Sequence, residues 1–218
     1  FTLQDNADTS KKAQFQCSGI SSSTTRTLTL PDSNGTLLTG KLAGTNFTGS
    51  LLVGHSTTGT LNAAQYNTGV GLAAMDAITS GDSNTAIGME ASTALTTGAH
   101  NVALGYRALY TASTTSSNTA VGRQSLRLTT GTGNTAVGRD SGEIIAAGNN
   151  NTCIGLHAGD NITSGSGNVS IGTQADPSSA TGNNQLVIGT YDGSTTTTWI
   201  TGDSSGNVIH AGTTHSAG

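Results

Sequence analysis

The chain has little charge and few large apolar side chains. Of its 218 residues, only 9% are charged and 4% are aromatic. Leu, Ile, Val and Phe together contribute 39 residues, about 18%, which is too few for the thick core of an ordinary enzyme of this length. Charge repulsion does not hold the chain open either, because its net charge is only −4. Two classes remain, a flexible linker or a repetitive structure ordered by stacked backbone and small side chains.

The composition also argues against membrane insertion, nucleic-acid binding, a disulfide framework and a metal site. No apolar run approaches the ~18 residues of a membrane span, so we expect no membrane insertion. Eight Lys and Arg residues in a mildly acidic chain argue against nucleic-acid binding. Two cysteines, Cys17 and Cys153, provide neither a disulfide framework nor a metal-ligand spacing. We therefore expect no cofactor and no metal site.

Glycine, by contrast, is abundant and recurs at a fixed period. Nine glycines each follow a short apolar stretch, and seven of the eight intervals between them are 17 residues, while the interval from Gly122 to Gly138 is 16. These turn glycines are Gly54, Gly71, Gly88, Gly105, Gly122, Gly138, Gly155, Gly172 and Gly189. The residue before each one is apolar: Val53, Val70, Ile87, Leu104, Val121, Val137, Ile154, Ile171 and Ile188. Asn stands four residues before the glycine in seven units: Asn67, Asn84, Asn101, Asn118, Asn134, Asn151 and Asn168. Such regularity identifies a repeat protein.

A 17-residue unit is too short for a helical-hairpin repeat or a propeller blade. Each unit predicts a short strand, a glycine turn, a second short strand and a polar turn. The chain is therefore expected to be all-β, a parallel β-solenoid of about nine coils, each hydrogen-bonded to the next. A second apolar position follows seven residues after the glycine, as at Ile78, and is expected to move to Leu128 in the 16-residue coil. The glycines are expected to adopt positive φ at the turns, and the Asn residues to adopt it too while their amides stack between coils.

The predicted strands have one aliphatic and one small face. Side chains alternate along a strand, so Ile87 lies with Thr85 on one face and Ala86 on the other. One or two apolar side chains per coil do not offset the ~1–2 kcal/mol per residue that backbone ordering costs. We therefore expect an obligate oligomer, in which several chains pool the nine aliphatic residues that precede the turn glycines into one packed core.

The units Asn84-Thr-Ala-Ile-Gly88, Asn101-Val-Ala-Leu-Gly105, Asn134-Thr-Ala-Val-Gly138 and Asn168-Val-Ser-Ile-Gly172 resemble the head repeats of trimeric autotransporter adhesins. The resemblance covers about residues 50–190. It implies a homotrimer of left-handed parallel β-rolls. The adhesin repeat is typically shorter than 17 residues, so we expect longer turns on one side of each coil here.

The flanking segments resemble parts of bacteriophage tail fibres. Segment 1–49, with Phe1-Thr-Leu-Gln-Asp-Asn-Ala-Asp8 and Thr25-Arg-Thr-Leu-Thr-Leu-Pro-Asp32, resembles an N-terminal β segment that is widespread in these fibres. It predicts strands at 1–5, 13–17 and 26–30, and a hairpin turn at Asn34-Gly35. Segment 191–218, with Thr198-Trp-Ile-Thr-Gly-Asp-Ser-Ser-Gly-Asn-Val208, resembles the stretch that precedes an intramolecular chaperone in phage fibres. Three parts are therefore expected: 1–49, the β-roll 50–190, and 191–218.

Motifs that suggest catalysis have simpler explanations in the repeat. Gly202-Asp-Ser-Ser-Gly206 fits the nucleophile elbow around Ser204, but the residues that follow predict a strand where the elbow needs a helix. Gly69-Val-Gly-Leu-Ala-Ala74 fits a dinucleotide fingerprint, yet it is one copy of the repeat without a βαβ context. The five histidines lack ligand spacing. We therefore expect no catalytic residues and no enzymatic activity.

Stacking places surface residues of successive coils side by side. One residue after the glycine, Arg123 adjoins Arg139, which favours either full solvation or an anionic partner such as a surface glycan. Leu72, Met89 and Tyr106 form an apolar row at the same position, suited to packing between subunits or to a receptor patch.

Two residues after the glycine, stacking predicts favourable exposed pairs. Glu90 falls beside Arg107, and Asp140 falls beside His157. Each pair is expected to contribute well under ~1 kcal/mol.

The resemblances together imply a non-enzymatic fibre segment of a phage or virus, a rigid trimer that mediates host-surface attachment. Its expected partners are further copies of the chain, a host receptor or glycan, and other tail proteins of the virion. A bacterial cell-surface trimeric adhesin with the same β-roll is one alternative. An ice-binding solenoid is another, suggested by Thr96-Thr97 and Thr129-Thr130, although Ala146-Ala147 interrupts that row. A polysaccharide depolymerase needs paired carboxylates on one face, and the 12 acidic residues form no recurring row.

Overall fold

The structure, a computed structural model, describes residues 40–44, 47–53 and 61–210, which belong to one compact unit, Leu38–Gly218. The strands predicted at 1–5, 13–17 and 26–30, the turn at Asn34-Gly35, and Gly54 lie outside the described residues.

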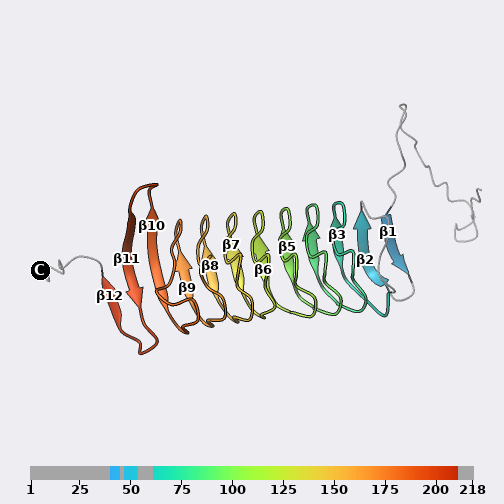
Figure 1. Cartoon of the computed structure of the whole chain (residues 1–218). Helices are drawn as coiled ribbons and strands as arrows, with labels where there is room; N and C mark the ends of the chain where they lie inside the picture. Colours follow the sequence, from blue (N-terminus) through green and yellow to red (C-terminus); the bar gives the residue numbers. More distant parts are fainter. Residues whose placement is uncertain (1–39, 45–46, 54–60, 211–218) are drawn as a thin grey trace, which may run out of the picture. The chain divides into compact units, whose positions relative to one another are not determined.

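Twelve strands form one sheet in chain order (Figure 1). An antiparallel hairpin pairs β1 (Gly40–Gly44) with β2 (Phe47–Val53). Parallel pairing then continues from β2 through β3 (Thr68–Val70), β4 (Thr85–Ile87), β5 (Val102–Leu104), β6 (Thr119–Val121), β7 (Thr135–Val137), β8 (Thr152–Ile154), β9 (Val169–Ile171) and β10 (Leu186–Tyr191). Antiparallel pairing resumes with β11 (Thr196–Gly202) and β12 (Val208–His210). Strands β2–β10 make about eight turns, which confirms the predicted parallel β-solenoid.

The predicted period sets the register of the sheet. Val53 lies opposite Val70, Val70 lies opposite Ile87, and the row continues in the same register to Ile171 opposite Ile188. Residues one repeat apart, 17 positions in most coils and 16 between β6 and β7, therefore occupy equivalent places on neighbouring strands.

The 16-residue coil keeps this register by losing one residue from a turn. Thr130 and Ala146, both eight residues after their glycines, are still joined by a backbone hydrogen bond of 2.6 Å. Gly131, the ninth residue, accepts the Asn side-chain bond that the tenth residue accepts in the longer coils. The expected shift of the second apolar position to Leu128 is wrong, because Thr129 fills that place at 0% exposure and Leu128 is half-buried.

The second strand predicted for each coil is absent from the described coils, where β3–β9 each have three residues followed by turns. Left-handed backbone explains this difference. Arg107 and Leu109, two and four residues after their glycine, have φ of +54° and +52°, and Ser117, just before the next Asn, has φ of +61°. Such residues interrupt extended backbone, so the chain turns instead of forming a strand. The turns still bond between coils, as from Met75 N to Ala91 O at 3.0 Å.

The Asn row forms a buried hydrogen-bonded ladder. Its seven side chains are at most 1% exposed. Asn101 Oδ1 accepts the backbone N–H of Asn118 (3.0 Å), and Asn101 Nδ2 donates to Asn84 Oδ1 (3.0 Å) and to the Thr115 carbonyl (2.9 Å). The predicted stacking of amides is thus present. The positive φ expected for these Asn residues is wrong, because it falls on the residue before each one, as at Ser117.

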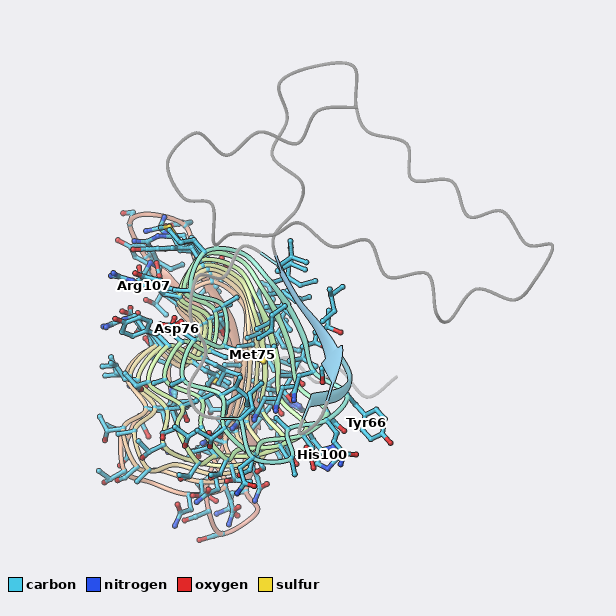
Figure 2. The ribbon with its side chains drawn as sticks, turned by 90° about the vertical axis from the view of Figure 1, so that its right-hand side faces the viewer. Tyr66, Met75, Asp76, His100 and Arg107 are labelled. Atoms are coloured by element: carbon cyan, nitrogen blue, oxygen red, sulfur yellow. The ribbon has the colours of Figure 1, made fainter. Side chains whose placement is uncertain are left out.

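The interior of each coil lies behind the small-residue face of the strands. Ala86, Ala103, Ala120, Ala136, Cys153 and Ser170 on this face are 0% exposed. The apolar residues seven after the glycine, Ile78, Leu95, Ile145 and Ile162, are buried in the same core, as are Met75, Leu109 and Leu126, four residues after it. Viewed along the stack, Met75 lies inside the coil and Arg107 projects outside (Figure 2). Each chain therefore has a narrow core of its own, larger than one or two side chains per coil.

The turn glycines are required by close contact between coils. Gly105 has φ of +132°, and a Cβ built there would lie 2.6 Å from the carbonyl oxygen of Gly122. The described turn glycines from Gly71 to Gly172 share φ values of +117° to +138°. Gly189 differs because it continues within β10.

We predict that Asn101→Ala lowers the free energy of unfolding by about 2–4 kcal/mol, because it leaves the buried Asn118 N–H and Thr115 carbonyl without their partners. Urea unfolding followed by circular dichroism at fixed protein concentration measures the loss. The control is Asn149→Ala, whose Oδ1 accepts the Thr132 N–H in an exposed turn and should lose less than about 1 kcal/mol. Equal losses in the two variants would contradict the buried ladder.

Candidate interaction surface

The aliphatic residues before the turn glycines face away from the coil interior. Val70, Ile87, Val137 and Ile154 are 37–45% exposed. The other residues of this row, Val53, Leu104, Val121, Ile171 and Ile188, are half-buried. We call these nine residues the outer aliphatic row. It runs in register along the outer face of nine strands, and a continuous apolar strip of this kind marks an interaction surface more often than scattered exposed residues do. Its packing between chains stays a prediction.

A second row stands one residue after the turn glycines, at the corner of the coil. Leu72 is 63% exposed, Met89 46% and Leu156 40%. Tyr106 belongs to this row and is half-buried. Arg123 and Arg139 fill the places between Tyr106 and Leu156. The corner row therefore changes along the stack from apolar to basic and back.

The predicted pair of Glu90 and Arg107 is present at this corner. Arg107 Nε donates to Glu90 Oε2 at 2.5 Å. The same guanidinium lies 5.0 Å from the ring centroids of Tyr106 and Tyr110. These contacts hold Arg107 in a one-to-one ion pair between two aromatic rings.

Arg123 and Arg139 meet at a shared carboxylate. Arg123 Nη1 lies 3.1 Å from Asp140 Oδ1, and Arg139 Nε lies 2.8 Å from Asp140 Oδ2. The predicted neighbour His157 is also present, with its Nε2 3.7 Å from Asp140 Oδ2. The exposure expected for this pair is wrong for Asp140, because its side chain is only 4% exposed. The Asp140 carboxylate therefore reduces the repulsion between the two arginines, a role that the repeat period did not predict.

A pair of carboxyl groups lies near the C-terminal end of the stack. Burial, followed by the nearby charge of Asp160, raises the pKa of Asp176 to about 6. Asp160 Oδ2 also lies 3.0 Å from His157 Nδ1. Asp160 stands five residues after its glycine and Asp176 four, so the two share no sequence row and the repeat pattern could not pair them.

Cys153 occupies the place that Ala holds in neighbouring coils. It pairs with Ala136 and Ser170 on the strands either side and is 0% exposed. Burial raises the pKa of the Cys153 thiol to about 12, so the thiol stays protonated and is a poor nucleophile at neutral pH.

The two motifs that suggested catalysis lie at strand ends and turns of the described residues. Gly202–Gly206 leads from β11 into β12 through a turn in which Asp203 Oδ1 accepts the N–H groups of Ser205 (2.9 Å) and Asn207 (3.0 Å). Gly69–Ala74 covers the end of β3 and its turn. Across residues 61–210 and the two short described segments before them, no cluster of three or more His, Cys, Asp or Glu side chains is placed to hold a metal.

Two small hollows of about 230 and 210 Å³ lie between the last coil and β11, and both are lined by Ser178, Gln185 and Gly202.

Comparisons with known proteins give no relative. Neither a scan of protein-family models nor searches of curated proteins and of solved structures found a match to this chain. The described residues also include no helix long and apolar enough to cross a membrane.

We predict that Asp176→Asn raises the melting temperature at pH 7.5 and changes it little at pH 4. The folded-state pKa of about 6 lies above the ordinary 3.8, so the folded chain holds this proton more tightly than the unfolded chain. The stability from this group is therefore present below about pH 4 and is lost as pH rises through about 6. Replacing the Asp176 carboxylate with a neutral amide therefore raises the stability of the fold at neutral pH.

Thermal unfolding from pH 4 to 8 measures this effect. The control is Asp192→Asn, because backbone N–H groups of Thr195 and Ser194 lower the pKa of Asp192. That variant should lower the melting temperature at pH 7.5, the opposite sign. Parallel pH profiles for Asp176→Asn and the unmodified chain would rule out the coupling between these two half-buried carboxyl groups.

Proposed function

We propose that this protein is a rigid structural fibre segment of a phage or virus that mediates attachment to the host surface as a homotrimer. The observation that carries the proposal is the outer aliphatic row, nine in-register aliphatic residues on the outside of the solenoid sheet. Three copies that turn these rows toward one another would bury them in a common core. Burial of apolar surface stabilises such an assembly by ~25 cal/mol per Å².

The internal bonding of the stack suits a mechanical role. Each coil is joined to the next by parallel strand pairing, by turn-to-turn backbone bonds and by the Asn ladder. All of these bonds repeat at about the ~4.8 Å strand spacing, so bending the stack would distort many of them together. The stack is therefore a stiff carrier for surface residues.

The viral setting rests on the resemblance of segments 1–49 and 191–218 to phage tail fibres. In this setting the partners are a host receptor or glycan and other tail proteins, and the location is the virion. A bacterial surface adhesin would use the same β-roll. Mass spectrometry of purified virions and of bacterial envelopes separates the two, because the fibre protein should be found in virions.

Ice binding is the second candidate function, and one observation favours it. Three residues before the turn glycines, Thr68, Thr85, Thr119, Thr135 and Thr152 lie in register on the outer sheet face, interrupted by Val102. The turn row that first suggested this role is less suitable, because hydroxyls such as that of Thr96 bind carbonyls of the next coil. Thermal hysteresis in the purified protein would support ice binding, and its absence would exclude it.

We predict a solution mass three times the chain mass of 21.6 kDa, measured by light scattering after size exclusion. Ile154→Asp should reduce the mass to that of one chain, because a carboxylate would be buried in the common core. Ile154 is 40% exposed in the single chain, so the coil itself should keep its circular dichroism spectrum.

The matched control is Ala147→Asp, which places the same charge at an exposed turn and should leave the mass unchanged. A single-chain mass for the unmodified protein would overturn the shared core. If Ile154→Asp leaves the oligomer unchanged, the outer aliphatic row does not form the interface between chains.

A further inference from the structure

The basic side chains of the solenoid are concentrated in three consecutive coils. Residues 61–210 contain four Lys or Arg residues, and all are arginines: Arg107, Arg123, Arg127 and Arg139. Parallel pairing of β5, β6 and β7 places their coils next to one another. This is the main cationic region of the described solenoid.

Two of these arginines are neutralised by partners of their own. Arg107 pairs with Glu90, and Arg127 Nε lies 2.7 Å from Glu143 Oε1. Arg123 and Arg139 instead share a single carboxylate, that of Asp140. Two guanidinium groups on one carboxylate leave one positive charge without a direct counterpart.

The excess positive charge lies at the surface, because the carboxylate is buried and the two guanidinium groups are exposed. The Asp140 side chain is 4% exposed, whereas those of Arg123 and Arg139 are 49% and 59% exposed. Within residues 61–210, Arg123 binds Asp140 through Nη1 and Arg139 binds it through Nε. Nη2 of Arg123 and both terminal nitrogens of Arg139 have no hydrogen bond to the described residues, so they remain as donors. Asp140 thus acts as a buried clamp that holds two exposed guanidinium groups.

The spacing of the two groups is set by the sheet. Val121 pairs with Val137, and each arginine follows two residues later, so their backbones are about 4.8 Å apart. Tyr106 precedes them in the corner row and Leu156 follows them, with 40% of Leu156 exposed. The two guanidinium groups can donate hydrogen bonds to carboxylates, and the flanking Tyr106 and Leu156 side chains can contact ring carbons of the same ligand.

We propose that Arg123 and Arg139 bind the carboxylate groups of an acidic surface glycan. The inference rests on the proposed attachment function and names the chemical class of its receptor. A guanidinium is planar and presents parallel N–H groups that match a carboxylate, so an arginine pair recognises uronate-type sugars by shape as well as charge. Nucleic acid is a poor alternative for a chain with eight basic residues and a net charge of −4.

Polygalacturonate is the probe, with neutral dextran and dextran sulfate as comparisons, in biolayer interferometry on the full chain at low salt. Polygalacturonate should bind, dextran should not, and dextran sulfate should bind no more tightly than polygalacturonate. Salt should weaken the interaction, because exposed charges are screened. The double variant R123Q/R139Q should lose at least about tenfold in affinity, the effect of about one lost charge-assisted contact.

Three milder arginine variants and one control protect the test against misfolding. R123Q and R139Q each leave Asp140 one arginine partner, and each should weaken binding by about threefold or more. R123K/R139K keeps both charges without the planar fork and should also weaken binding. R127Q is the matched control, because Arg127 pairs with Glu143, and its affinity should equal that of the unmodified chain.

The proposal is overturned if polygalacturonate does not bind, if only dextran sulfate binds, or if R127Q loses as much as R123Q/R139Q. These results are separable from failure of the proposed function. A trimer that adsorbs to host cells but ignores polygalacturonate keeps the attachment role and loses the carboxylate site. A single-chain protein that binds polygalacturonate through the two arginines keeps the site and loses the trimeric fibre.

Discussion

The buried Asn ladder is the interaction on which every coil depends. The Oδ1 atom of Asn84 accepts the backbone N–H of Asn101 at 2.9 Å, which joins one coil to the next. The Nδ2 atom of Asn84 donates to the carbonyl of Gly98, 14 residues later in the same coil, at 2.9 Å. One Asn side chain thus forms a hydrogen bond within its own coil and another to the next coil. A side chain without both a donor and an acceptor could not do this.

This closure determines which side chains remain for contacts outside the chain. The interior is narrow and is filled by alanines and by one or two larger apolar residues from most turns, as by Ala103 and Leu95. Alternation along three-residue strands then forces the neighbouring aliphatic residue, such as Ile87, to the outer face. The turn that follows each glycine places charged and aromatic groups at the corner. Core, outer sheet face and corner therefore follow from one backbone path.

Some of this arrangement could be predicted from residues alone, and some could not. The 17-residue spacing of Gly and aliphatic residues predicts parallel stacking in register, because equal residues recur at equal depth in each coil. The turns could not be predicted in the same way. Arg107 and Leu109 have no intrinsic preference for positive φ, and their conformation is imposed by bonds to neighbouring coils. Asp160 and Asp176 meet although they occupy different rows, and Asp140 serves two arginines, which only the side-chain geometry reveals.

The two ends of the stack differ from its middle. A parallel stack of nearly identical coils has an open strand at each end, and such an edge can recruit further copies as amyloid does. Here the chain reverses direction at both ends, in the β1–β2 hairpin and in the β10–β12 meander. The reversed strands β1 and β11 occupy the outer edges of β2 and β10, the first and last strands of the parallel stack. With both of these edges covered within the chain, the length of the parallel stack follows from the number of repeats in the sequence, which separates a stack of defined length from an open-ended aggregate.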